Sequence, residues 1–175
     1  IRAMPEIRRR APDAALLIVG DGPDRERLER LASDAPHGSV AFAGQVSEGD
    51  LPRYYRAGNV FAMPCRNRFG GFEVEGWGNV FIEAAACGRP VVVGDSGGAR
   101  ESLVPGETGL LVDGSDGAQV SDAVGSLLAD PARAQSMGRA GRERVERAFA
   151  WSRPAEQLAG WLREAGVDER VINGV

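Results

Sequence analysis

The sequence predicts an α/β domain in which a parallel sheet carries helices on both faces. Three observations lead to this fold class. Five short apolar runs of strand length alternate with longer amphipathic segments of helical period, the order typical of parallel sheets. Glycine and proline residues separate the two kinds of segment. The chain of 175 residues has 43% hydrophobic residues, which suits one globular domain with a substantial core.

The expected elements follow one another in a regular order. From the amino end they are a helix over residues 1–10, strands over 14–19 and 40–43, and helices over 24–35 and 47–57. The carboxyl half continues with strands over 60–63, 90–94 and 110–112, and with helices over 79–87, 99–103, 116–128, 131–149 and 155–165. The chain opens with a helix, whereas sheets of this kind normally open with a strand, so we expect a missing first strand.

The first glycine turn, Gly20-Asp21-Gly22-Pro23, lies between a strand and a helix, as in a dinucleotide-binding fingerprint. The third glycine of that fingerprint is missing, however, and Pro23 lies where the loop must wrap a pyrophosphate. We therefore expect no NAD site at this turn.

The most informative stretch covers residues 61–97. The loop before the helix over 79–87 carries four glycines, more than a connection needs. Such a loop lets a ligand approach the backbone closely. The helix N-terminus that follows offers unpaired N–H groups and a partial positive charge, so we expect it to bind phosphate.

Two acids frame this anion site, Glu75 in the loop and Glu83 in the helix, with seven residues between them. Helical side chains lean toward the N-terminus, so Glu83 can reach a group that rests over the helix end. Carboxylates repel phosphate but accept hydrogen bonds from hydroxyl groups. A ligand with hydroxyl groups on both sides of a phosphate fits this arrangement. A nucleotide sugar is such a ligand, with a ribose on one side and a hexose on the other.

The stretch EGWGNVFIEAAACGRPVVVGDSGGARE resembles the Glu-x7-Glu signature of retaining glycosyltransferases of the GT-B fold. Its longer form EVEGWGNVFIEAAACG is similar to the phosphatidylinositol mannosyltransferase branch, and IVGDGP, FAGQV and ETGLLV also occur in the family's order. The resemblance implies the Rossmann-like C-terminal, donor-binding half of a two-domain enzyme. Residues 1–150 are then the nucleotide-sugar-binding domain without its first strand, and residues 151–175 a crossover helix and tail. The acceptor, a lipid or a glycan, binds a missing N-terminal domain.

The resemblance also implies roles for individual residues. Glu75 is the catalytic candidate, which orients the transferred sugar, and Glu83 contacts the ribose hydroxyls. Glu48 lies by the base and matches the two adjacent donors of guanine, which favours GDP-mannose. The candidate donor-binding residues are Glu83, Gly76, Trp77, Gly78, Asn79, Val80, Val46, Glu48 and Gly20.

Simpler explanations stay open for several of these residues. Glu48 and Glu83 can each stabilise a helix dipole, and Glu75 can be a solvated loop acid. Trp77 suits packing, with sugar stacking as the alternative. Arg66 and Arg68 can add positive charge near the phosphate, although they match no family motif.

Composition excludes several other classes. A net charge of −4, without a basic face, argues against nucleic acid as a partner. Two cysteines without metal-ligand spacing and a single histidine indicate no metal, and we expect no cofactor besides the donor substrate. No apolar run reaches the roughly 20 residues of a membrane helix. We expect a cytoplasmic protein, and a peripheral contact with the inner membrane face stays open.

Three functional classes stay open at this point. The first is a retaining hexosyltransferase, in which diphosphate leaves and the acceptor hydroxyl attacks from the same face. The second is a nucleotide-sugar epimerase of similar two-domain fold, and the third is a non-catalytic nucleotide-sugar-binding module. For the first class we expect the isolated chain to be inactive and to self-associate.

Overall fold

The computed structural model describes residues 1–150 and 152–172. Its strands are β1 Leu16–Val19, β2 Val40–Gly44, β3 Phe61–Met63, β4 Val91–Gly94 and β5 Gly109–Val112. Its α-helices are α1 Met4–Arg10, α2 Arg25–Ser33, α3 Leu51–Ala57, α4 Asn79–Ala86, α5 Gly117–Ala129, α6 Pro131–Ala148, α7 Ser152–Glu164 and α8 Glu169–Ile172. Two short 3-10 helices, η1 Phe69–Gly71 and η2 Gly97–Ser102, complete the set. The expected α/β class is confirmed.

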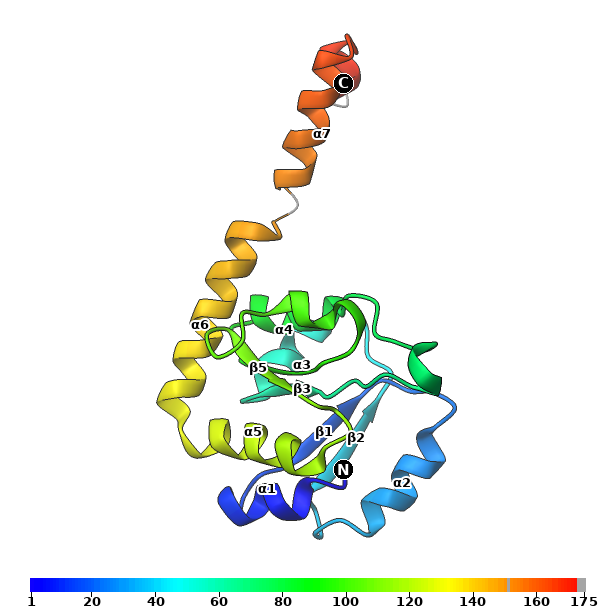
Figure 1. The fold of residues 1–175 in the computed structure, drawn as a ribbon, viewed down its shortest axis with the longest axis vertical. Coiled ribbons are helices and arrows are strands. Elements are labelled where there is room, and N and C mark those ends of the chain that lie inside the picture. Colours follow the sequence, from blue (N-terminus) through cyan, green and yellow to red (C-terminus); the bar gives the residue numbers. More distant parts are fainter. Residues whose placement is uncertain (151, 173–175) are drawn as a thin grey trace.

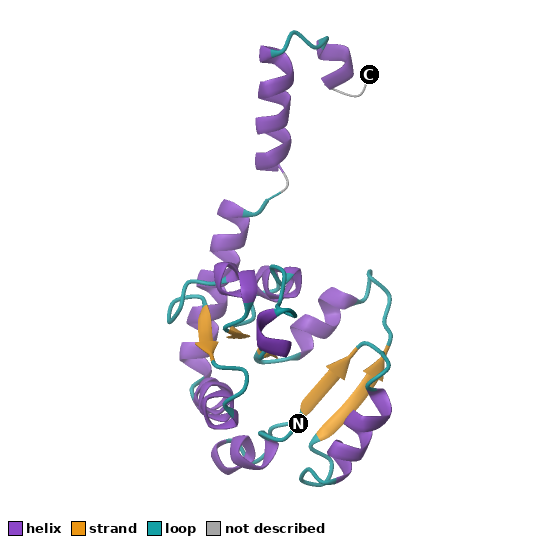
Figure 2. Ribbon diagram, turned by 45° about the vertical axis from the view of Figure 1, so that its right-hand side comes forward, coloured by secondary structure: helices purple, strands orange, loops and turns teal. Residues whose placement is uncertain are grey.

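The strands form two parallel sheets rather than one. β1 pairs with β2, and β3, β4 and β5 pair in that order, with Phe61 opposite Val91 and Val91 opposite Gly109. Figure 2 shows the β1–β2 pair standing apart from the other strands. The single sheet predicted from the sequence is therefore divided, because within the described residues no strand pairs with both β1 and β3.

Strand β4 lies at the centre of the core. Val91 and Val93 point to one face and pack with Phe81 of α4, and all three are buried. Val92 points to the other face and packs with Leu127 of α5 and residues of α6. Because successive strand residues alternate between faces, this apolar run packs against helices on both faces of the sheet, as the sequence predicts.

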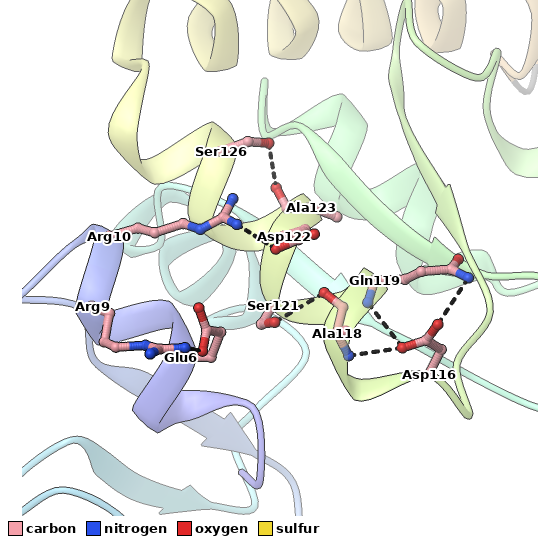
Figure 3. A network of polar contacts seen from close by, with 10 residues as sticks. All are labelled: Glu6, Arg9, Arg10, Asp116, Ala118, Gln119, Ser121, Asp122, Ala123 and Ser126. Carbon is pink, nitrogen blue, oxygen red and sulfur yellow. Dashed lines mark hydrogen bonds and ion pairs between the residues drawn. The ribbon is translucent and has the colours of Figure 1, made fainter.

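Local side-chain chemistry sets the ends of the central helices. Asp116 accepts hydrogen bonds from the N–H groups of Ala118 and Gln119, at 2.8 and 3.1 Å, and so caps the start of α5 (Figure 3). At the end of α4 the chain turns through Gly88, whose φ is +71°. The N–H of Arg89 then donates to the carbonyl of Ala84 at 3.0 Å. This closes a Schellman motif at the predicted helix stop.

Helix α1 is held against α5 by side chains from both helices. Arg10 Nη2 lies 2.5 Å from Asp122 Oδ1, and Figure 3 shows the arginine reaching across to α5. A Cβ built at Gly125 would lie 2.9 Å from Cδ of Arg10, so the arginine stem lies against the α5 backbone. The first helix is thereby fixed to the body of the domain.

Several helix starts differ from the sequence prediction by one to four residues, and two of these differences have a local cause. The helix expected over 47–57 begins at Leu51, because Ser47 Oγ accepts the N–H of Asp50 at 3.2 Å and holds the preceding residues in a turn. The last long helix begins at Ser152, not at residue 155. Pro154 falls in its first turn, where a missing N–H breaks no helical bond. The expected break at Trp151, and with it the 150/151 boundary, lies outside the described residues.

The carboxyl-terminal helices extend away from the body (Figure 1). Helix α6 packs on α4 along part of its length, and α7 lies beyond it with α8 folded against its end. The side chains of Leu158 and Trp161 on α7 are 53% and 59% exposed. Within the described residues, no helix is both long and apolar enough to cross a bilayer.

Candidate functional site

The candidate residues lie in loops at the carboxyl ends of the parallel strands. Gly20 follows β1, Val46 and Glu48 follow β2, and the loop with Glu75 follows β3. Ligands of open parallel sheets bind at this edge. A cavity of about 300 Å³ lies there, with Glu75, Arg66 and Arg68 in its wall. These loops follow strands of the two separate sheets.

The loop that carries Glu75 is tied to the turn after β4. The N–H of Glu75 donates to Ser96 Oγ at 3.1 Å, and Ser96 Oγ donates to Asn67 Oδ1 at 2.7 Å. The N–H of Gly98 donates to the carbonyls of Glu75 and Gly76, at 3.2 and 3.0 Å. Ser96 is 1% exposed, so these bonds are shielded from water. They fix the backbone at Glu75 on both sides.

This contact requires glycine in the turn after β4. A Cβ built at Gly97 would lie 2.0 Å from the carbonyl oxygen of Glu75, and one at Gly98 would lie 2.3 Å from that of Gly76. No side chain fits at either position without moving the Glu75 loop. This glycine pair belongs to the family motif, but its contact with the Glu75 loop is not encoded in the local sequence pattern.

Helix α4 begins directly after the Glu75 loop, as predicted. Gly78 has a φ of +74°, and a Cβ there would lie 2.4 Å from the ring of Phe81, so glycine is needed on both counts. The chain turns sharply at Gly78 and starts the helix at Asn79. The first N–H groups of an α-helix have no intrahelical acceptor. Asn79 and Val80, which open α4, therefore follow the Glu75 loop with N–H groups that have no acceptor within the helix.

Trp77 is used for packing. Its ring meets Phe149 edge-on, with centroids 5.2 Å apart, and Arg144 lies 4.7 Å from the same Phe149 centroid. Arg144 also donates to the carbonyls of Ser102 and Glu101, each at 2.8 Å. Trp77 thus connects the loop to the end of α6, which agrees with the packing explanation given above.

Glu83 has a partner that sequence reasoning missed. The hydroxyl of Tyr55 on α3 donates to Glu83 Oε2 at 2.7 Å. Burial first, and then this hydrogen bond, raise the pKa of Tyr55 well above its ordinary value, so the hydroxyl stays a donor. The two residues are 28 positions apart, and no local pattern in the sequence links them.

The residues on the β1–β2 sheet are arranged more simply. Gly20 adopts a φ of +112°, and its N–H donates to the carbonyl of Gly44 at 2.8 Å, which joins the ends of β1 and β2. Val46 is half-buried and Glu48 is exposed in the turn before α3. Since α3 begins at Leu51, Glu48 lies outside the first helical turn. The helix-dipole explanation for Glu48 is weakened accordingly.

The two loop arginines differ in their surroundings. Arg68 pairs with Glu73 at 3.2 Å and lies over the ring of Phe69, 5.1 Å from its centroid. Arg66 lines both the cavity beside Glu75 and a second one of about 510 Å³ beside Asp95 and Asp113. Across the described ranges, no three His, Cys, Asp or Glu residues are grouped to hold a metal ion.

Comparison with known proteins connects this geometry to a family. The family model described as "Glycosyl transferases group 1" matches residues 1–144. The chain belongs to this family. It is 51% identical over 172 residues to the GDP-mannose-dependent alpha-(1-6)-phosphatidylinositol monomannoside mannosyltransferase of Mycolicibacterium smegmatis, covering 94% of this chain and 44% of the relative. It is 45% identical over 163 residues to the GDP-mannose-dependent monoacylated alpha-(1-6)-phosphatidylinositol monomannoside mannosyltransferase of Corynebacterium glutamicum. That match covers 93% of this chain and 42% of the relative. The resemblance to the mannosyltransferase branch is confirmed.

Solved structures support the fold of this group 1 glycosyl transferase chain. Sucrose-phosphate synthase from Thermosynechococcus elongatus aligns with a TM-score of 0.76 at 35% identity, covering 94% of this chain and 43% of that one. Anabaena HepE in complex with UDP-glucose aligns with a TM-score of 0.77 at 21% identity, covering 93% of this chain and 44% of that one. At this identity the match shows a likeness of fold alone. The predicted GT-B fold is confirmed, and the chain spans less than half the length of these relatives.

Proposed function

We propose that this domain binds the nucleotide-sugar donor of a retaining mannosyltransferase, with GDP-mannose as donor and a phosphatidylinositol mannoside lipid as acceptor. The names of the relatives at 45–51% identity support this choice of substrates. The observation that carries the proposal is the set of hydrogen bonds with Ser96 and Gly98 that hold the Glu75 loop in place. This loop leads into the N–H groups at the start of α4 that have no acceptor within the helix. A lipid acceptor also suggests a peripheral contact with the inner membrane face.

In this proposal the donor diphosphate lies over the N-terminus of α4. The N–H groups of Asn79 and Val80 and the positive end of the helix dipole attract its charge. Glu83, on the second turn of α4, accepts from the ribose hydroxyls. Glu75, in the loop ahead of the helix, accepts from hydroxyls of the mannose and so orients the anomeric carbon.

The base is recognised at the loop after β2. The exposed carboxylate of Glu48 can accept from two adjacent guanine donors, N1–H and the amino group. Uracil presents the O4 acceptor instead, which a carboxylate repels. The half-buried Val46 offers an apolar contact to the base plane. This arrangement favours GDP over UDP.

The chemistry follows from charge stabilisation at fixed positions. The bond between the anomeric carbon and the diphosphate oxygen breaks, and the negative charge collects on the diphosphate beside α4. Arg66, which lines the cavity beside Glu75, adds positive charge to the site. Preorganised groups of this kind supply several kcal/mol to a transition state. The acceptor hydroxyl then attacks the anomeric carbon from the face that the leaving group vacates and gives its proton to the departing diphosphate oxygen, with no metal and no cofactor.

Isothermal titration calorimetry of the chain with GDP and UDP tests the proposal. We expect GDP to bind and UDP to bind more weakly. A clear preference for UDP would contradict the choice of GDP-mannose. For turnover, the domain can replace the matching part of the Mycolicibacterium smegmatis relative. Mannose transfer to the lipid is expected from this hybrid, whereas release of a free epimer would indicate an epimerase, and nucleotide binding without turnover a binding module.

A further inference from the structure

Tyr55 and Glu83 form a polar contact between two helices that the proposed roles do not explain. The phenol hydroxyl donates to Glu83 Oε2 at 2.7 Å, although the Glu83 side chain is exposed and can be hydrated by water. Solvation of the carboxylate therefore does not require Tyr55. The effect of this hydrogen bond is to select one orientation of a flexible side chain.

Aromatic packing holds the Tyr55 ring against the helix that carries Glu83. Tyr55 meets Phe61 edge-on with centroids 5.4 Å apart, and Phe61 meets Phe81 in the same way at 5.9 Å. Phe81 is fully buried and lies on α4, two residues before Glu83. The Tyr55 hydroxyl thus has a fixed position relative to the start of α4, and its hydrogen bond orients the Glu83 carboxylate.

The geometry points to Tyr55 as a positioning residue, which orients the Glu83 carboxylate to accept from the ribose hydroxyls of the donor. This inference rests on the proposed function. An ionised carboxylate can accept about four hydrogen bonds, so Tyr55 leaves capacity for the ligand. Immobilising a free glutamate on binding reduces affinity by roughly two- to twelvefold. A carboxylate that Tyr55 has already oriented avoids most of that loss.

The test compares Tyr55→Phe with Tyr54→Phe in the 175-residue chain. Phenylalanine keeps the ring that packs on Phe61 and removes the hydroxyl. Tyr54 is a matched control because it is half-buried on the same helix and points about 100° away. Dissociation constants are measured by calorimetry for GDP and for 2′,3′-dideoxy-GDP, which lacks both ribose hydroxyls.

We expect Tyr55→Phe to raise the Kd of GDP by about two- to twelvefold and to leave the Kd of dideoxy-GDP unchanged. Tyr54→Phe should change neither. In a Glu83→Gln background the effect of Tyr55→Phe should shrink, because the hydroxyl acts through the carboxylate. An equal loss for both nucleotides, or no loss for GDP, would overturn the inference alone. A wild-type chain that does not bind GDP would overturn both this inference and the proposed function.

Discussion

Replacing Gly98 by alanine tests whether contact with the turn after β4 positions Glu75. A Cβ at Gly98 lies 2.3 Å from the carbonyl oxygen of Gly76, whereas ordinary van der Waals contact begins at 3.4 Å. The Glu75 loop must therefore retreat by 3.4 − 2.3 = 1.1 Å. A displacement of about 1 Å at a reacting centre costs on the order of 10²-fold in rate. We expect a loss of that size in kcat for mannose transfer.

The assay uses the hybrid enzyme described above, with GDP-mannose and the lipid acceptor. Gly117→Ala is the matched control, because a Cβ there meets no atom within 4 Å. Melting temperatures of both variants show whether the domain remains folded. If Gly98→Ala turns over donor at the wild-type rate, or if Gly117→Ala loses as much activity, the contact between the turn after β4 and the Glu75 loop does not position Glu75.

Three further predictions concern the two acids, the metal and a helix cap. Glu83→Gln should weaken GDP binding, while Glu75→Gln should spare GDP binding and lower turnover, because the first contacts the nucleotide and the second the sugar; equal effects of the two on calorimetric GDP affinity would show that the roles are misassigned. Incubation with EDTA should leave mannose transfer by the hybrid unchanged, and activity that returns only with added Mg²⁺ would contradict this. Asp116→Ala should lower the melting temperature of the chain at pH 7 by removing the hydrogen bonds that cap α5. Backbone hydrogen bonds lower the pKa of Asp116, so the stability that its carboxylate contributes is present above its ordinary pKa and is lost as the pH falls through the lowered value. The melting temperatures of the wild-type chain and of Asp116→Ala should therefore converge in acid. A difference that stays constant with pH would contradict this.

The sequence was sufficient for features that depend on local patterns. The run of valines predicted the strand at β4, and the glycine and proline residues between segments predicted where α4 ends, because each signal lies within a few residues of the element it defines. The family motif marked the glycine loop and the two acids. Trp77 was a donor-binding candidate for which packing was the simpler explanation, and its contact with Phe149 agrees with packing.

Long-range contacts were not predictable in the same way. The hydrogen bonds from Tyr55 to Glu83 and from Glu75 to Ser96 join residues 28 and 21 positions apart. They depend on how α3, α4 and the turn after β4 pack, which periodicity does not encode. The division of the sheet was missed for a related reason, since strand patterns reveal that a segment is a strand but not which strand it pairs with.

Every role proposed for the site depends on nucleotide phosphate binding at the start of α4. A crystal structure of the chain with GDP tests it most directly. We expect phosphate oxygens within hydrogen-bond distance of the N–H groups of residues 78–81, with the ribose beside Glu83. Phosphate bound instead at the turn Gly20-Asp21-Gly22-Pro23 would contradict it.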